Sequence, residues 1–358
     1  MPSHSLSIAA LRPFGQCLLL LLFWGLTCTP VQAQSDDQTT SELLENFFRD
    51  NEQASESDAQ MFLENLDNYR NRPLDLNRAS REDLLGLHLL NDIQVENLIA
   101  YRGQLGGLLN IYELQAVPGW DLDDIRRMLL FSKVSDALDT RNTRIINGFY
   151  EGENELVVGW GRPVPAPYPA AAEGGRNAWG LRFRHSFDNR LRFGFTAEND
   201  PGEAFFAKSN PQGFDFYSAH LFAQNVNRTV RTLALGDYSA RWGQGLLLQT
   251  GFSPGKSAET TAVTRSGQKL NAYGAFGEAY FFRGAAATLG FGKHLEITAL
   301  YSDRRRDANI DTTDLEFPEI IFSSLQTAGL HRTASEITNE KSLHEQIGGL
   351  SATYGWRS

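Results

Sequence analysis

The feature that most constrains the fold is a long series of short segments in which apolar and polar residues alternate. In Leu181–Phe187 the apolar residues fall on one side and the arginines on the other. Asp188-Asn189 supplies a turn, and the alternation resumes at Leu191. Successive side chains of a β-strand point to opposite faces of a sheet, so this period of two indicates strands with one apolar face. We therefore predict an antiparallel β region over residues 140–358.

The same alternation returns throughout this region. Further strands are predicted at Ile145–Glu151, Glu155–Gly161, Asp215–Ala223, Val230–Asp237, Gly245–Thr250, Gly277–Arg283, Ala286–Gly292, Leu295–Tyr301 and Leu350–Trp356. A soluble β-sandwich and an outer-membrane β-barrel use the same alternation, so the pattern alone leaves both architectures open.

Three features favour the barrel. Some connections are long and polar, notably Asp303–Phe317. Arginines recur on the polar side of the strands, as a water-filled lumen requires: Arg182, Arg184, Arg192, Arg231 and Arg241. Aromatic residues stand at strand ends, as in a membrane girdle: Tyr150, Trp160, Trp179, Tyr238, Trp242, Tyr273 and Tyr280. The predicted fold class is α+β, with a small all-α domain followed by an antiparallel β-barrel.

Residues 1–33 are predicted to be a secretory signal peptide. Arg12 supplies the positive start, Cys17–Leu26 is a short apolar run, and Val31-Gln32-Ala33 offers a small-x-small cleavage site. The apolar run is shorter than the roughly 20 residues that span a bilayer. Export is therefore expected.

An acidic, partly helical arm is predicted over residues 34–72, as either a mobile segment or a docking helix pair. The two cysteines, Cys17 and Cys28, both fall in the expected signal peptide, so we expect no disulfide in the mature protein. The formal net charge is -10, which is the wrong sign for a general nucleic-acid binder.

Between Leu74 and Phe131 the apolar spacing becomes that of short helices. Leu84, Leu98, Leu114 and Ile125 each belong to one predicted helix. Three of the four predicted helices follow a side chain suited to capping: Ser80 or Asn77, then Asn91 or Asp92, and finally Asp121. We predict a compact all-α domain over residues 73–135, with its helices paired across two hairpins.

The order of these motifs resembles the tandem helix-hairpin-helix domain of the ComEA type. The matching residues are the entry Leu76-Asn77-x-Ala79-Ser80-x-x-x-Leu84, the core Ile99-x-Tyr101-Arg102, and the second hairpin Tyr112-x-Leu114-x-x-Val117-x-Gly119. The resemblance implies phosphate binding by backbone N–H groups at the hairpins and the helix N-termini that follow them.

Candidate binding residues for DNA or a protein partner are taken from the two hairpins and the last helix: Leu89, Leu90, Asn91, Gly119, Trp120, Arg126 and Arg127. The sequence departs from the family at this point. The first hairpin has no glycine, and acids follow both hairpins, Asp92 in one and Asp121 in the other. Acids also outnumber bases in the domain, which favours a packing or protein-binding module over DNA binding.

The order of domains resembles Gram-negative exported proteins that carry a helix-hairpin-helix unit ahead of a barrel. This resemblance implies an envelope location but no assigned reaction. Because the strand series stops at Trp356-Arg357-Ser358, we expect a C-terminally truncated chain and an incomplete barrel. An open sheet edge is costly in lipid.

No catalytic or metal motif is found, and no cofactor is predicted. Gly251–Ser257 has the wrong glycine spacing for a P-loop. The histidines lack the i, i+4 spacing of a zinc site: His185, His220, His294, His331 and His344. Glu278, Glu296 and Asp303 are charges of a wet lumen that could also meet as paired carboxylates.

Two functions follow as hypotheses. The first is a non-enzymatic outer-membrane β-barrel protein, in contact with lipid, whose periplasmic helix-hairpin-helix module binds an envelope protein or plugs the pore during transport or envelope assembly. The alternative is a DNA-uptake receptor of the ComEA type, in which the helical domain grips duplex DNA by its phosphates.

Overall fold

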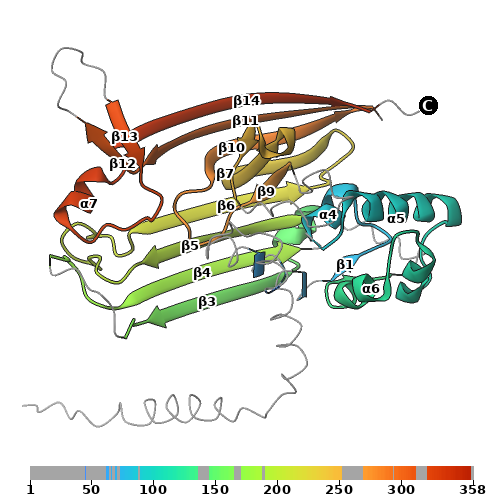
Figure 1. The fold of residues 1–358 in the computed structure, drawn as a ribbon, viewed down its shortest axis with the longest axis horizontal. Coiled ribbons are helices and arrows are strands. Elements are labelled where there is room, and N and C mark those ends of the chain that lie inside the picture. Colours follow the sequence, from blue (N-terminus) through green and yellow to red (C-terminus); the bar gives the residue numbers. More distant parts are fainter. Residues whose placement is uncertain are drawn as a thin grey trace, which may run out of the picture. The chain divides into compact units, whose positions relative to one another are not determined.

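The computed structural model (Figure 1) describes residues 45, 62–63, 66, 69–70, 73–87, 89–135, 145–164, 171–187, 190–251, 269–292, 294–311 and 321–355. The expected signal peptide, most of the acidic arm and nearly all of the glycine-rich segment Gly251–Ser257 lie outside these residues. Among the described residues, no helix combines the length and apolar character needed to cross a bilayer.

Short helices occupy the first part of the described chain. The elements are β1 (Leu74–Asp75), α4 (Arg81–Gly86), α5 (Asp92–Leu105), the 3-10 helix η1 (Ile111–Ala116), α6 (Leu122–Leu129) and β2 (Ser132–Lys133). The predicted caps are confirmed for α4, α5 and α6. Ser80, Asn91 and Asp121 each accept a hydrogen bond from the third helical N–H, and the side chain of that third residue accepts one from the backbone N–H of the cap.

A leucine-rich core holds these helices together. Its fully buried members are Leu76, Leu84, Leu85, Leu87, Val95, Leu98, Leu108, Leu114 and Met128. Three apolar residues of α5 and α6, which their helical spacing would place with the buried side chains, are exposed: Ile93, Leu122 and Leu129. Helices this short bury one narrow stripe, and these side chains lie outside it. β1 and β2 pair in parallel and join the two ends of the segment.

A large antiparallel sheet makes up most of the remaining described chain. Its strands are β3 (Glu153–Gly161), β4 (Ala178–Phe187), β5 (Leu191–Asn199), β6 (Phe216–Gln224), β7 (Val230–Trp242), β10 (Phe282–Phe291), β11 (Leu295–Arg306) and β14 (Leu343–Tyr354). Each strand pairs with its neighbour in the order β14-β11-β10-β7-β6-β5-β4-β3. β8 (Leu248–Gln249) and β9 (Leu270–Ala272) pair with β7. The α+β class and the antiparallel sheet are confirmed.

The sheet is not closed into a barrel. In the described part of the chain β3 pairs with β4 alone and β14 with β11 alone, so these two strands form open edges. The alternation seen in the sequence is the same in an open and a closed sheet, which is why it could not decide closure.

Several shorter elements differ from expectation. The predicted strand at Ile145–Glu151 is the 3-10 helix η2 (Ile145–Phe149), and Ile145 packs on a cluster formed by Phe187, Leu191 and Ala223. The 3-10 helix η3 (Gly243–Gly245) replaces the start of the predicted strand Gly245–Thr250, and β10 begins only at the end of the predicted strand Gly277–Arg283. Elements that the sequence did not suggest are β9, β12 (Ala308–Asp311), β13 (Ile321–Leu325) and α7 (Ala334–Asn339).

The two faces of the sheet differ in character. Strand register places one apolar set on the same face of all eight consecutive strands, with Val158, Leu181, Ala197, Tyr217, Leu235, Ala285, Tyr301 and Leu350 among its members. The opposite face carries Arg182, Arg184 and Arg192, as predicted, and also a buried cluster that includes Phe222, Tyr238, Phe282 and Leu300. Tyr238 and Tyr273 were expected in an exposed aromatic girdle and are buried instead.

The two ends of the sheet differ in the length of their connections. At one end the strands are joined by the short segments 188–190, 225–229 and 292–294. At the other end the connections are the long segments 162–177, 200–215, 243–281 and 307–342. β3 begins and β14 finishes at the end with short connections. The chain therefore enters the sheet there.

Candidate functional site

The predicted binding residues of the first hairpin lie just before α5. Leu89 is half-buried and Leu90 is buried. Asn91 accepts a hydrogen bond from the Gln94 N–H and caps α5. The side chains of this hairpin are therefore used for packing and capping.

The second hairpin is bonded to α5 through Gln94. Its Nε2 donates to the Gly119 carbonyl at 3.0 Å, and Trp120 Nε1 donates to the Gln94 carbonyl at 3.1 Å. Trp120 is buried. These two hydrogen bonds hold Gly119 and Trp120 against the start of α5, so the two hairpins pack together.

Acids within α6 pair with both predicted arginines. Arg126 Nη1 lies 3.0 Å from Asp123 Oδ1, and both side chains are well exposed. Arg127 Nη2 donates to Asp124 Oδ1, and the Asp124 side chain is buried. Phosphate would have to compete with these carboxylates for the guanidinium groups.

The helix N-termini of this segment are also occupied by acids or amides. Asp121 accepts from the Asp124 N–H at 2.7 Å, and Asn91 accepts from the Gln94 N–H at 2.9 Å. A carboxylate at the start of α6 supplies the negative charge that the helix dipole favours. An incoming phosphate would meet this carboxylate at the position where the family binds its ligand.

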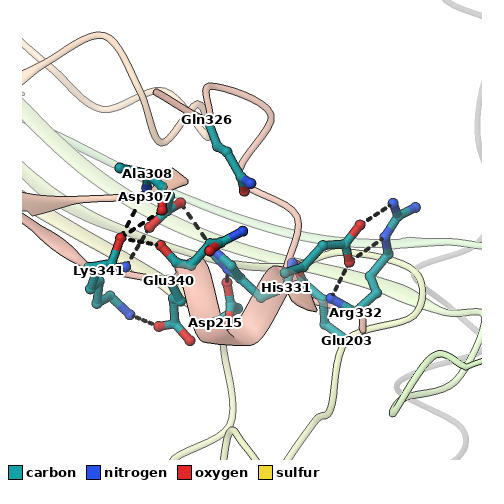
Figure 2. A network of polar contacts seen from close by, with 12 residues as sticks. Glu203, Asp215, Asp307, Ala308, Gln326, His331, Arg332, Glu340 and Lys341 are labelled. Carbon is teal, nitrogen blue, oxygen red and sulfur yellow. Dashed lines mark hydrogen bonds and ion pairs between the residues drawn. The ribbon is translucent and has the colours of Figure 1, made fainter. Parts of the chain in front are cut away.

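A second cluster of polar residues lies at the end of the sheet with long connections. Glu203 and Asp215 come from the connection between β5 and β6, and Asp307 lies between β11 and β12. His331 precedes α7, and Glu278 precedes β10. Figure 2 shows the His331 ring between Asp215 and Asp307. We call these five residues the carboxylate–histidine cluster.

The imidazole of His331 is bonded on both of its nitrogens. Nδ1 is hydrogen-bonded to Asp215 Oδ2, and Nε2 lies 3.0 Å from Asp307 Oδ2. The His331 backbone N–H donates to Glu203 Oε1 at 2.9 Å. Burial alone would lower the pKa of His331, but the bonds to Asp215 and Asp307 raise this pKa to about 11.

Two glutamates of the cluster carry strongly shifted pKa values. Burial, together with the nearby Asp215 carboxylate, raises the pKa of Glu278 to about 9. Burial and Asp215 raise the pKa of Glu203 to about 7. The cluster therefore gathers four carboxylates around one imidazole, and desolvation opposes the ionisation of Glu278 and Glu203.

The segment that carries His331 is fixed by the start of α7. Thr333 caps this helix, and the Glu336 side chain accepts a hydrogen bond from the Thr333 N–H at 3.0 Å. Arg332 Nη2 donates to Glu336 Oε1 at 2.8 Å. The Arg332 side chain holds the pKa of Glu336 down to about 2. This local network orients the residue next to His331.

Donor atoms in the carboxylate–histidine cluster are spaced closely enough to share a metal ion. One donor atom from each of Glu203, Asp215 and His331 lies within 4.8 Å of the others, and the same holds for Glu278, Asp307 and His331. The five residues come from three separate connections between strands of the sheet, so no short-range spacing in the sequence indicates them. The one local signal near the cluster was the capping motif of α7, Thr333-x-x-Glu336, which follows His331 in the sequence.

The alternative considered for Glu278, Glu296 and Asp303, that they meet as paired carboxylates, does not occur. Glu296 and Asp303 point to opposite faces of β11, because they are an odd number of residues apart. Glu296 Oε2 lies 3.7 Å from Lys269 Nζ, and Asp303 Oδ1 lies 2.8 Å from His344 Nε2. Glu278 belongs to the carboxylate–histidine cluster.

Compared with protein-family models, curated proteins and solved structures, the chain finds no match in any of the three. The resemblance to helix-hairpin-helix domains therefore depends on the residues quoted above.

Proposed function

We propose that this chain is an exported, non-enzymatic outer-membrane protein whose antiparallel sheet is part of a β-barrel wall. Its helical segment would act in the periplasm as a module for a protein partner, in transport or envelope assembly. The observation that carries the proposal is the apolar face of the sheet, which is exposed at large side chains on its edge strands and its central strands.

That face is open to solvent at many large side chains. Leu350 on β14 is 74% exposed, Leu156 on β3 is 64% exposed, and Leu235 on the central strand β7 is 42% exposed. A monomeric soluble protein rarely exposes so large a contiguous apolar surface. Such a face is suited to contact with the hydrocarbon chains of a lipid bilayer.

The height of the apolar band also suits a membrane. On β4 this face runs from Trp179 to Phe187, which is roughly 26 Å at about 3.3 Å per residue. At its end His185 and Phe187 are buried, His185 bonded to the Gly148 carbonyl of η2 and Phe187 packed with Ile145. Lipid-facing bands of outer-membrane barrels are about 25 Å tall. Towards the long connections the face becomes charged, with the Asp237–Arg283 ion pair and Asp303.

Exposed aromatic residues border the band at both ends. Phe291 and Tyr354 stand at the end with short connections, and Trp160, Tyr217 and Tyr301 stand towards the other end. Aromatic rings are favoured at the level of the lipid headgroups, where one side is apolar and the other wet. Two such borders support a membrane position for the sheet.

The connections give the proposed orientation. Outer-membrane barrels have short turns on the periplasmic side and longer loops outside. Since the chain enters at the end with short connections, the helical segment is assigned to the periplasm. In lipid the edge strands β3 and β14 must be hydrogen-bonded to further strands, because unpaired backbone groups are costly there.

The helical segment fits protein binding better than DNA binding. Its helix N-termini are capped by its own side chains, and Arg126 and Arg127 are paired with acids. Exposed apolar side chains on the segment suit a protein surface: Ile93, Leu105, Leu109, Tyr112 and Leu122.

Site-directed spin labelling of the full chain in bilayers tests the membrane proposal. Single cysteines at Leu350 and Ser351, which face opposite sides of β14, are introduced after Cys17 and Cys28 are replaced. We expect the label at position 350 to collide with oxygen and not with a water-soluble nickel chelate. Position 351 should show a lower oxygen accessibility. Ready access of the nickel chelate to position 350 and to a second label at Leu235 would exclude a lipid-facing sheet.

A further inference from the structure

We propose that His331, Asp307 and Glu278 bind a divalent transition-metal ion of the Zn²⁺ or Mn²⁺ class. The site lies among the long connections of the sheet, at the end opposite to the chain's entry. It is independent of the membrane proposal, since none of its three ligands belongs to a strand.

The donor atoms are already close to the separation that a metal requires. His331 Nε2 and Asp307 Oδ2 are 3.0 Å apart. Two ligands at about 2.0–2.1 Å from a tetrahedral ion are about 3.3 Å apart. A donor atom of Glu278 lies within 4.8 Å of both of the others. A small outward movement of these side chains would admit the ion.

The other nitrogen of His331 has the partner that a metal-binding histidine needs. Asp215 Oδ2 is bonded to Nδ1, and Asp215 is held in turn by Asn210 Nδ2 at 2.8 Å. Histidines that ligate metals commonly donate their second N–H to a carboxylate, which fixes the tautomer and the ring orientation. Glu203 adds a bond to the backbone of His331. Asp215 and Glu203 are therefore positioning residues.

Glu278 is the residue that indicates a metal site, because ion pairs and hydrogen bonds within the cluster do not explain its position. Asp215, Glu203 and Asp307 each accept hydrogen bonds, but Glu278 has no hydrogen bond or ion pair within the described residues. Its carboxylate is largely removed from water beside three other carboxylates. A carboxyl withdrawn from water without a hydrogen-bond partner is costly, and a divalent cation would displace its proton and bind the carboxylate.

The ligand set selects the class of metal. An imidazole nitrogen favours zinc, manganese or iron over calcium and magnesium, which prefer all-oxygen sites. Two carboxylates and one imidazole, with no thiolate, fit a borderline ion. In the absence of metal, the hydrogen bond between His331 Nε2 and Asp307 contains a proton that the ion would displace.

Zinc titration of the full chain in detergent tests the proposal, with the protein first treated with a chelator. The key variant is Glu278→Gln, which removes a ligand charge without removing any hydrogen bond. Loss of a residue that merely supports a ligand costs about 10–100-fold in metal affinity. We therefore expect Glu278→Gln to weaken zinc binding by at least about 100-fold. Without zinc its thermal midpoint should stay close to that of the wild type, because Gln replaces a carboxyl group that makes no hydrogen bond within the described residues.

His344→Gln is the matched control. His344 also pairs with an aspartate, Asp303, but on the exposed surface of β14. The zinc affinity of His344→Gln should stay within about twofold of the wild-type value. Calcium at a concentration equal to that of zinc should not displace zinc from the wild-type protein. The proposal is overturned if wild-type protein does not bind micromolar zinc, if Glu278→Gln binds zinc as tightly as wild type, or if His344→Gln abolishes binding.

Discussion

Gly329 lies directly against the side chain of Glu278. A Cβ atom built on Gly329 would come within 2.8 Å of Glu278 Cδ and 2.9 Å of its Cγ. The backbone at Gly329 has a φ of +61°, a conformation that residues with a side chain rarely adopt. The glycine thus permits both the turn before His331 and the approach of Glu278.

Replacing Gly329 by alanine is therefore expected to lower the stability of the fold and to weaken zinc binding. The left-handed backbone and the contact together should destabilise the fold by about 1–2 kcal/mol. The displaced Glu278 carboxylate should also bind zinc more weakly. Thermal denaturation and zinc titration measure the two effects. Gly348→Ala is the control, because a Cβ there meets nothing within 4 Å. An equal effect of both variants would contradict this account.

Acid is expected to weaken the network at the start of α7. The Arg332 side chain holds the pKa of Glu336 at about 2, below its ordinary value of 4.5. A carboxylate with a lowered pKa contributes stability above about pH 4.5, and this contribution is lost as the pH falls towards 2. Glu336→Gln should thus cost about 2 kcal/mol at pH 7, after allowance for solvent screening, and much less at pH 2.

Differential scanning calorimetry of wild type and Glu336→Gln at pH 7 and pH 2 checks this sign. Glu340→Gln, in the turn that follows α7, removes a charge from the same segment and serves as the control. A constant difference between wild type and Glu336→Gln at both pH values would argue against a role for the ionised carboxylate.

Local signals in the sequence were sufficient for the helical segment. Ser80, Asn91 and Asp121 were identified as caps because capping needs only one side chain and the next few residues. Alternation identified most long strands for the same reason. The ends of β10 and the helix η2 were missed, because their apolar residues pack against parts of the chain distant in sequence.

The carboxylate–histidine cluster could not be read from the sequence. Glu203 and His331 are 128 residues apart and meet only through the sheet order. The spacing of the histidines contains no local motif, and a site assembled from three connections leaves none in the sequence. Closure of the sheet was equally hidden, because it depends on pairing between the first and last strands.

Duplex DNA is expected to bind the full chain weakly, if the helical segment is a protein-binding module. Phosphate contacts would give an affinity that falls steeply with salt. We expect no salt-dependent duplex binding between roughly 50 and 200 mM salt. Over this range the affinity of a protein with several phosphate contacts falls steeply. Arg126→Ala and Arg127→Ala should not change the result. Tight binding at low salt that is lost in these two variants would restore the DNA-uptake hypothesis.

Asn77 is expected to be the most sensitive polar residue of the helical segment. Its Nδ2 donates to the carbonyls of Leu108 at 2.8 Å and Ser135 at 2.9 Å, and its Oδ1 accepts from the Leu108 N–H at 2.7 Å. Leu108 is fully buried, so Asn77→Ala leaves its backbone groups without partners. Each such loss costs about 1–3 kcal/mol, and we expect a total of about 2–4 kcal/mol.

Hydrogen exchange at the Leu108 amide measures this effect directly. A loss of about 2–4 kcal/mol corresponds to exchange faster by about 30- to 1,000-fold, if opening of this segment governs the exchange. Asn97→Ala is the matched control, because Asn97 makes one exposed bond, to the Pro118 carbonyl at 2.8 Å. It should change Leu108 exchange by less than about threefold. If Asn77→Ala leaves this amide protected, the segment is held by its leucine core alone, and the side chain of Asn77 adds nothing to its stability.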